Sequence, residues 1–304
     1  MAVAEEADEM MIPQASKALS SGHGWIRELP VLGAGIGFRE PFRGQLFLNQ
    51  SKVDFLEITA DHFFDTTTAK ELELELLAEH FVLIPHGLNL SLGSAEGLDQ
   101  GYVGKFSRLV NRLQPPWWSE HIAFTRAGGL EIGHLTPMPF TRAAIRSLCR
   151  NIAEVRDRIG PRLILENITF NVTMPDAEMN EAQFLSEVIG RTGCGLLLDV
   201  TNLHANSVNH RYDPIEFLDA IPMEKVVQLH FVGGHEVGGR MIDSHSEPTP
   251  PEVWQLLEEV VKRAPVKGVI LERDDNLPPF GELAGEVGRA REILWRCSGN
   301  TPTM

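Results

Sequence analysis

The sequence predicts a single α/β domain folded as a (β/α)8 TIM barrel, and three observations support this fold class. Eight short apolar runs alternate with segments whose apolar residues recur at helical spacing. The runs are almost continuously apolar, as expected of parallel strands covered by helices on their outer face. The length of 304 residues is normal for an α/β barrel. A doubly wound open sheet would show the same alternation and is the alternative.

The predicted strands are the eight apolar runs. In chain order they span 30–38, 53–59, 81–92, 117–124, 162–168, 194–202, 225–233 and 268–275. The first run contains GAGIG (33–37), which lacks the G-x-G-x-x-G spacing of a dinucleotide-binding loop and is interpreted as a bend in a strand. Trp117 and Trp118 begin the fourth run and are expected to pack in the core.

The predicted helices lie between these runs. In the segments 141–159 and 251–263 the apolar residues recur at intervals of three and four. The same spacing marks the segments 68–79, 103–113, 180–190 and 281–295. Thr141 and Asn180 directly precede two of these helices and are expected to be N-caps.

Composition restricts the possible partners. Lys and Arg number 27 against 42 Asp and Glu, for a net charge of −15, so a nucleic-acid partner is not expected. No apolar run approaches the ~18 to 20 residues of a membrane span, and the acidic N-terminus differs from a secretory signal. The three cysteines form no CxxC pair, which indicates a reducing compartment and a cytoplasmic protein.

The barrel is assigned to 29–297, between a polar N-terminal tail (1–28) and a C-terminal tail (298–304).

Potential metal ligands follow nearly every predicted strand. The active site of a TIM barrel lies at the carboxyl ends of its strands, and seven of the eight runs deliver a histidine or carboxylate there. These residues include Glu57, Asp61, His62, His86, Glu120, His121, Glu166, Asp199, His204, His210, His230, His235, Asp243, His245, Glu272 and Asp274. Carboxylates and imidazoles without thiolates suit Mn, Fe, Co or Zn in an open site. The donors exceed the need of one ion, so two or three ions with bridging carboxylates are predicted.

A lone histidine at a strand end is more often a hydrogen-bonding group than a metal ligand. Structural carboxylates and histidines would, however, be spread over both ends of a barrel and over the helix surfaces. Eight of the eleven histidines lie at the carboxyl ends of the runs, and only His23, His80 and His134 do not. This coincidence favours a metal site.

Several segments carry a resemblance to a known family. They are HGLNLSLGS (86–94), WWSEHIAF (117–124), LILENI (163–168), TGCGLLLDVTNL (192–203), SVNH (207–210), QLHFVGGH (228–235), IDSH (242–245) and LERDDNLPP (271–279). Their order and spacing resemble the multinuclear non-haem iron-dependent oxidative enzymes from about residue 31 to 295. The resemblance implies a TIM barrel with two or three irons of mixed Fe(II)/Fe(III) state. It also implies O2-dependent modification of a Cys, Asp or Asn in a ribosomally synthesised precursor peptide, whose leader a partner protein commonly recruits.

Carried over by position, the resemblance also implies site residues. The iron ligands would be His86, Glu120, Asn167, Asp199, His230, Asp243, His245 and Glu272, with Glu120 as the bridging carboxylate. The family's histidine after the second strand is replaced in TADH (59–62), so His62 is expected to supply that imidazole, and His204 is an alternative donor. The catalytic set would be Glu120, Asp243, Asp274 and His235, of which the last two would orient imidazoles or move protons.

Two other functions fit the same donors. A redox-inert sugar isomerase or phosphodiesterase of the xylose-isomerase-like barrels would use a divalent metal without O2. A metal-binding accessory protein would bind the ions without turnover. The acidic surface would suit a basic leader peptide or partner.

Overall fold

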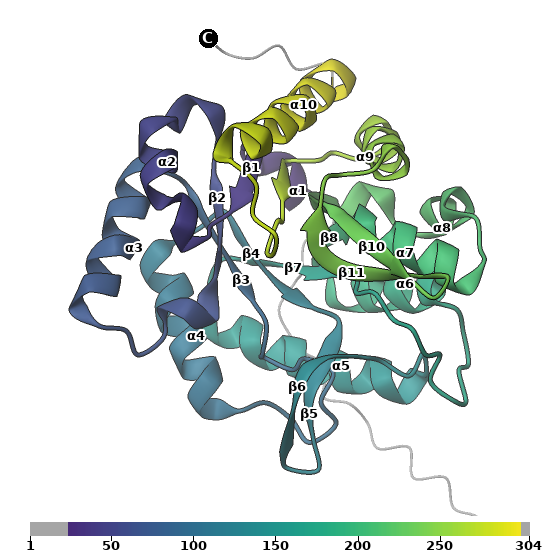
Figure 1. Ribbon diagram of the computed structural model, residues 1–304. Coiled ribbons are helices and arrows are strands. Elements are labelled where there is room, and N and C mark those ends of the chain that lie inside the picture. The colour runs from purple at the N-terminus through teal and green to yellow at the C-terminus, as the bar shows by residue number, and fades with distance from the viewer. Residues whose placement is uncertain (1–23, 299–304) are drawn as a thin grey trace, which may run out of the picture.

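In the computed structural model, which describes residues 24–298, eight parallel strands form a closed barrel (Figure 1). They are β1 (Gly33–Gly37), β2 (Leu56–Thr59), β3 (Leu83–Gly87), β4 (Trp117–His121), β7 (Arg162–Glu166), β8 (Gly195–Asp199), β9 (Val226–Phe231) and β12 (Gly268–Leu271). The first strand pairs with both β2 and β12, which closes the sheet. The predicted TIM barrel is therefore confirmed, and the open-sheet alternative is wrong.

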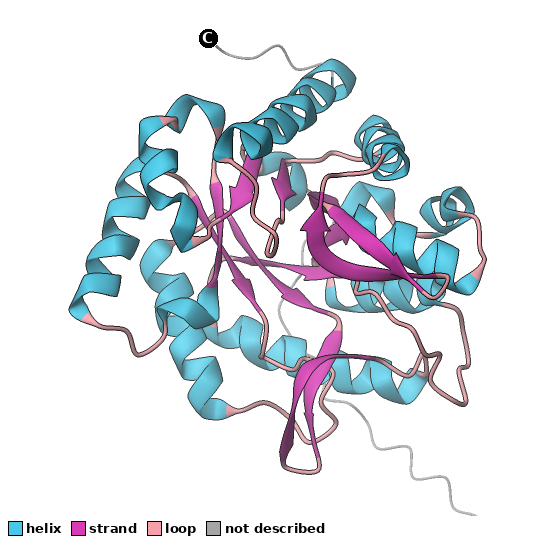
Figure 2. Ribbon diagram, viewed as in Figure 1, coloured by secondary structure: helices cyan, strands magenta, loops and turns pink. Residues whose placement is uncertain are grey.

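Helices surround the barrel (Figure 2). They are α2 (Arg43–Leu48), α3 (Thr68–His80), α4 (Gln100–Leu113), α5 (Arg142–Arg158), α6 (Glu181–Thr192), α7 (Val200–His210), α8 (Pro214–Ala220), α9 (Pro251–Arg263) and α10 (Phe280–Ser298). Both predicted N-caps are confirmed: Thr141 accepts from the Ala144 amide at 3.2 Å, and Asn180 forms a capping box with Gln183. The short α2 and the helices α7 and α8 were not predicted. Within residues 24–298, no helix combines the length and apolar character needed to cross a membrane.

Two β-hairpins extend from the carboxyl ends of β4 and β9 (Figure 1). One pairs β5 (Ala123–Ala127) with β6 (Leu130–Pro137), and the other pairs β10 (Gly233–Val237) with β11 (Arg240–Glu247). Each turns on a Gly-Gly pair with positive φ at both residues, as the type I′ turn of a two-residue hairpin requires. These hairpins were not predicted. The predicted strand 117–124 includes only the first two residues of β5, and the predicted strand 225–233 includes only the first residue of β10.

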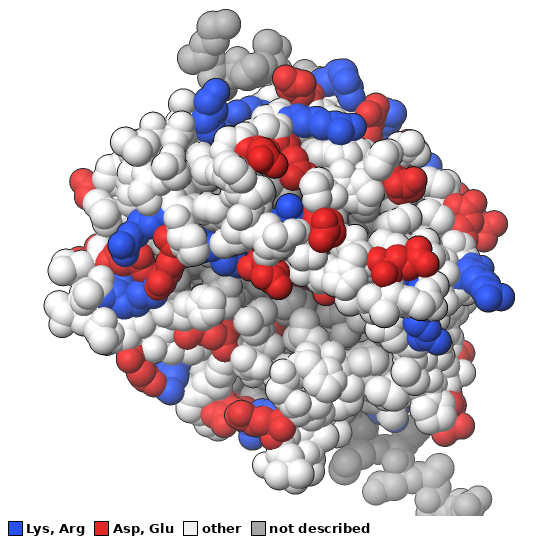
Figure 3. Space-filling view, viewed as in Figure 1, with Lys and Arg blue, Asp and Glu red and all other residues white. Residues whose placement is uncertain are grey.

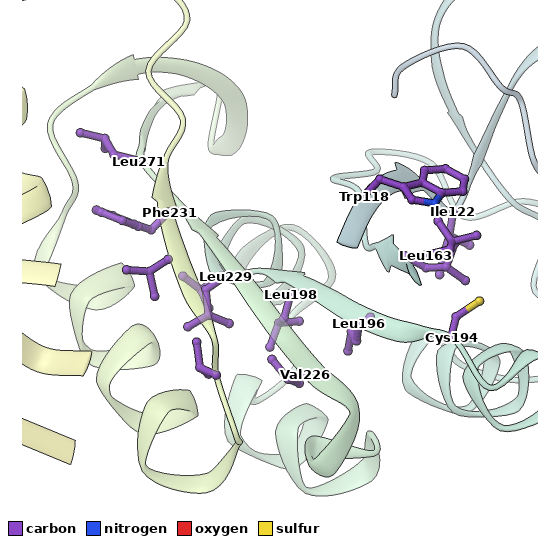
Figure 4. Close-up of a cluster of buried hydrophobic side chains, with 14 of the residues drawn as sticks. Trp118, Ile122, Leu163, Cys194, Leu196, Leu198, Val226, Leu229, Phe231 and Leu271 are labelled. Carbon is purple, nitrogen blue, oxygen red and sulfur yellow. The ribbon is translucent and has the colours of Figure 1, made fainter. Parts of the chain in front are cut away.

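The hydrophobic core has an outer and an inner part. The outer part lies between strands and helices and contains Trp118, Leu163, Leu198 and Phe231 (Figure 4). The inner part fills the floor of the barrel with Phe55, Ile84, Trp117, Ile164, Leu197, Val227 and Ile270. Both tryptophans are fully buried, which confirms their predicted packing.

A short helix, α1 (Trp25–Glu28), packs against this inner part through the buried Ile26. The barrel domain therefore includes residues that the sequence placed in the N-terminal tail. The remainder of that tail, residues 1–23, and residues 299–304 lie outside the described part of the chain.

The GAGIG segment forms β1, and its glycines leave room inside the barrel. A Cβ atom at Gly35 would lie 2.4 Å from the Phe55 carbonyl oxygen and 2.8 Å from Ile270 Cδ1. The glycine is thus explained by the close approach of neighbouring strands rather than by phosphate binding. β1 itself contains no carboxylate or imidazole.

Candidate metal centre

Above the apolar floor, the interior of the barrel is lined by carboxylates and imidazoles. Side chains on a strand alternate between its two faces, so residues two positions beyond a floor residue point inward as well. Ile84, Ile164 and Ile270 belong to the floor. This alternation brings His86, Glu166 and Glu272 into the barrel, and the same rule places Glu57, His121 and Asp199 there. All six are buried.

The first group of possible metal ligands consists of His86, His121 and Glu166. The Nε2 atoms of the two histidines lie 3.4 and 3.3 Å from Glu166 Oε2. Their other nitrogens are held from outside the group, His86 Nδ1 by Ser119 Oγ at 2.8 Å and His121 Nδ1 by the Gly87 carbonyl at 3.1 Å. Such contacts direct the opposite nitrogen of each ring toward a common point.

The second group consists of Glu166, Asp199, His230 and Glu272. His230 Nδ1 lies 3.2 Å from Glu166 Oε1 and 3.0 Å from Glu272 Oε2. Asp199 Oδ1 accepts hydrogen bonds from the backbone amides of Thr201 and Asn202 in the first turn of α7, which leaves Oδ2 for the group. On the far side of the imidazole, His230 Nε2 lies 2.8 Å from Glu57 Oε1.

The third group consists of His245, Glu272 and Asp274 and is more open. His245 Nδ1 lies 3.0 Å from Asp274 Oδ2 and 3.7 Å from Glu272 Oε2. Its Nε2 lies 2.7 Å from Oδ1 of Asp243, so β11 contributes two potential donors. The side chain of Asp274 is 41% exposed, whereas that of His230 is fully buried.

Two carboxylates connect the three groups. Glu166 belongs to the first and second, and Glu272 belongs to the second and third. A carboxylate has two oxygens and can bridge two cations. The donors are therefore arranged for a row of up to about three ions with Glu166 and Glu272 between them.

The hydrogen bonding of these residues fits a metal. Among the described residues, Asp199 Oδ2 is buried without a hydrogen-bond partner, and His86 Nε2 and Glu166 Oε2 have only their 3.4 Å contact with each other and the 3.3 Å contact of Glu166 Oε2 with His121 Nε2. Buried polar atoms in native proteins are nearly always satisfied by a protein group, water or an ion. Three such atoms in one place, all potential ligand atoms, match what bound cations would satisfy.

Burial and neighbouring charges also shift the pKa values of the centre. Burial alone would lower the pKa of His121, but the carboxylates of Glu166 and Glu120 outweigh it and raise this pKa to about 9. The pKa of Asp199 is raised to about 7, first by burial and then by the carboxylates of Asp243 and Glu166. The centre thus retains protons at neutral pH that a bound cation would displace.

The structure brings together most of the ligands that the sequence predicted. His86, Asp199, His230, Asp243, His245 and Glu272 all lie in or beside the three groups, and so does the predicted catalytic residue Asp274.

Glu120 lies outside the three groups. It follows Trp118 on the outer face of β4, and its Oε1 and Oε2 accept hydrogen bonds from the amides of His121 and Leu90 at 2.8 and 3.0 Å. Strand alternation explains this position, since Trp117 and His121 occupy the inner face. Glu166, and not Glu120, is the carboxylate that the first two groups share.

Four other predicted residues also lie outside the groups. His62 and His235 are exposed, on the turn after β2 and on β10, and His204 is half-buried on α7. Asn167 is buried beside the centre, but both atoms of its amide bond to the backbone of Asp199, at 2.9 and 3.1 Å.

Two group members were named among the strand-end residues but not among the ligands. His121 and Glu166 would have been selected by counting alternate residues from the floor of the barrel. Gln228 was missed altogether, although it donates to Glu57 at 2.6 Å and accepts from the indole of Trp117 at 2.7 Å. A β-bulge in β9 turns both Val227 and Gln228 inward, and the sequence carries no sign of it.

Replacing Gln228 by leucine is expected to lower the free energy of unfolding by about 2 to 5 kcal/mol, because Trp117 Nε1 and Glu57 Oε2 would each lose a buried partner. Urea denaturation measures this change. The exposed Gln50 provides the control, since its replacement by leucine should alter the free energy by less than about 0.5 kcal/mol. Equal effects of the two substitutions would contradict the bridging role of Gln228.

The closed barrel and its inner donors define a class of TIM-barrel proteins whose carboxylates and imidazoles could hold metal ions at the carboxyl ends of the strands. A family model described as "RiPP precursor modification enzyme MbnB/TglH/ChrH" matches residues 33–295. The chain belongs to this family, which confirms the resemblance seen in the sequence.

Two curated relatives are named UPF0276 protein. The one from Streptomyces avermitilis is 39% identical over 276 residues, which are 88% of this chain and 56% of that protein. The chain thus spans little more than half the length of this relative. The one from Caulobacter vibrioides is 35% identical over 263 residues, which are 86% of this chain and 94% of that protein.

Solved structures with the same fold include the D-psicose 3-epimerase of Clostridium cellulolyticum H10 with D-tagatose. It has a TM-score of 0.55 and 12% identity, covering 88% of this chain and 99% of that one. A D-psicose 3-epimerase with D-fructose has a TM-score of 0.54 and 13% identity, covering 88% and 100%. These likenesses show the fold alone.

Proposed function

We propose that this protein is a multinuclear non-haem iron enzyme that uses O2 to modify a residue of a ribosomally synthesised precursor peptide. The modified residue in this proposal is a cysteine, with Asp and Asn as alternatives. One observation carries the proposal: three groups of donors are joined by Glu166 and Glu272 inside the barrel of a chain that belongs to this family.

The protein side chains would fix the geometry of the ions. Ser119 and the Gly87 carbonyl orient two imidazoles, and Glu57, held by Gln228, orients that of His230. Such contacts fix the ring tautomer and raise the basicity of the ligand nitrogen. When bound, iron would supply O2 activation and acidify a coordinated substrate thiol.

The exposure of the groups indicates how a peptide would reach them. The first two groups are almost completely buried, whereas the side chains of His245 and Asp274 are 14% and 41% exposed. His245 lies on β11, in the hairpin β10–β11 (Figure 1). A substrate would therefore approach from the third group, with the buried groups protected from water.

A leader-recognition protein is the proposed partner, and the cytoplasm the proposed location. The net charge of −15 would favour a basic leader or partner. On the face of the described residues shown in Figure 3, acidic and basic side chains are interspersed, so the negative charge there is spread out. Cys149, Cys194 and Cys297 are free thiols, as proteins of a reducing compartment commonly have.

The test combines metal analysis with spectroscopy. Protein produced in iron-rich, oxygen-poor medium is expected to contain more than one iron per chain. A cysteine peptide should then produce a visible ferric-thiolate absorption band, and air should change the peptide mass with uptake of O2. A serine version of the peptide is the control and should give no band. Turnover of a sugar or phosphodiester with Mn or Zn in the absence of O2 would instead support the redox-inert alternative.

A further inference from the structure

A cavity on the flank of the barrel is lined by residues that lie outside the metal-ligand groups. Its volume is about 410 Å³, within the range of small-molecule sites. The start of α6, the end of α7, the helix α8 and residues 170–179 surround it.

Aromatic rings form much of the wall of this cavity. Phe140 and Phe170 contact each other edge to face, with centroids 5.5 Å apart, and Phe170 stacks on His210 at 4.3 Å. Tyr212 and Phe217 form a second stacked pair at 6.0 Å. These contacts hold the rings in place, and aromatic faces attract organic cations within about 6 Å.

The polar part of the cavity is acidic. Glu181, Asp213 and Glu216 line it, and among its described lining residues there is no lysine or arginine. An apolar wall with carboxylates and no opposing cation is complementary to an apolar group that carries a positive charge.

The carboxylate of Glu181 is only weakly held by the protein. Its oxygens accept from Asn206 Nδ2 and from the Tyr212 hydroxyl, both at 3.4 Å. The carboxylate of Glu120, which has a structural position, accepts two amide hydrogen bonds at 2.8 and 3.0 Å. Glu181 therefore has the capacity for a stronger partner than the protein provides.

We propose that this flank cavity binds an organic cation, an alkyl or aromatic group bearing an ammonium, with the aromatic rings around the apolar part and Glu181 facing the charge. The cation would come either from a free amine or from a lysine side chain of a peptide. This binding does not depend on the metal centre.

The pH dependence of binding follows from the same carboxylate. Burial raises the pKa of Glu181 to about 8, against the lowering effect of Tyr212 and Asn206. At pH 7 the Glu181 carboxyl group is mostly protonated when no ligand is bound, so binding of a cation releases its proton. The affinity for the cation should therefore rise by about tenfold between pH 7 and pH 9. His210, Tyr212, Asp213 and Glu216 also face the cavity, so the carboxylate must be tested by substitution.

Titration calorimetry of the full-length, as-purified protein with benzyltrimethylammonium tests the proposal. One saturable site is expected, with the neutral benzyl alcohol and the anionic phenylacetate binding at least tenfold more weakly. Glu181→Gln should weaken binding of the cation at pH 9 by at least tenfold and abolish the pH dependence. Glu187→Gln, at a partly exposed carboxylate that pairs with Arg191 on the same helix and outside the cavity, is the matched control and should leave binding of the cation unchanged.

A second substitution guards against a folding defect. Phe217→Leu keeps an apolar side chain but removes an aromatic face. It should therefore weaken binding of the cation more than binding of benzyl alcohol. The tripeptide acetyl-Ala-Lys-Ala-amide is compared with n-butylammonium, which matches the end of a lysine side chain. Tighter binding of the tripeptide indicates a peptide lysine, and tighter binding of n-butylammonium indicates a free amine. The proposal is overturned if the cation binds no better than benzyl alcohol, or if both Glu181→Gln and Phe217→Leu bind it like the wild type.

Discussion

Replacing Glu166 by glutamine is expected to remove about two of about three metal ions per chain, because this carboxylate belongs to both buried ligand groups. Its Oε2 faces His86 and His121, while its Oε1 lies 3.2 Å from His230. An amide has the size of a carboxylate but not its charge, and its nitrogen cannot accept a cation. Affinity at both positions should fall by more than the ~10- to 100-fold typical of residues that only hydrogen-bond to a ligand.

Metal content per chain after dialysis at equal iron concentration measures this loss. Glu120→Gln is the matched control, since it makes the same chemical change one strand away. It should lower the metal affinity less than Glu166→Gln does, because among the ligand side chains Glu120 contacts only His121 Nδ1, at 3.3 Å. It should also lower the free energy of unfolding by about 1 to 3 kcal/mol, because one of two buried amides loses its acceptor. If Glu120→Gln lost the ions and Glu166→Gln kept them, Glu120 would be the bridging carboxylate, as the resemblance implies.

The choice between these two glutamates shows how far the sequence could lead. All eight strands were predicted, because fully buried strands produce apolar runs that stand out from amphipathic helices. The same runs contain the information on which side chains point inward. Trp117 and His121 share the inner face of β4, so Glu120 between them must face α4. Alternation decides this point more reliably than the order of motifs.

Other features could not be predicted because local sequence does not determine them. The helix α7 reads VTNLHANSVNH, with β-branched residues and asparagines that have low helix propensity. It begins directly after β8 because Asp199 caps it, and that depends on the position of Asp199 in the barrel. The helix α1 has four residues and is stabilised by its packing against the floor of the barrel.

The hairpin β10–β11 depends on the fold in the same way. Its Gly-Gly turn is visible in the sequence, but β10 is mostly exposed, β11 is mostly half-buried, and neither strand has a clear apolar alternation. Only the folded chain places His245 beside Glu272, 27 positions away in the sequence. The third ligand group is thus a product of tertiary structure, and it can be removed separately from the other two.

Replacing His245 by asparagine is expected to remove about one ion and to leave the two buried ones. His245 is the only imidazole of the third group, where it lies 2.7 Å from Asp243 and 3.0 Å from Asp274. Its φ of +49° lies in the left-handed region, which asparagine tolerates better than most residues, so the backbone should keep its conformation. The third group is the most exposed, so the peptide substrate would bind there under the proposed function. Loss of its ion should therefore lower turnover of the peptide by more than about 100-fold.

Metal content and single-turnover rates, measured side by side, separate this effect from a loss of folding. His235→Asn makes the same substitution on the same hairpin, at an exposed position outside the ligand groups, and should retain all ions and activity. Loss of activity in His235→Asn with full metal content would instead support the catalytic role that the sequence suggested for His235. Retention of every ion in His245→Asn would mean that the third group does not bind metal, and the centre would then hold two ions around Glu166.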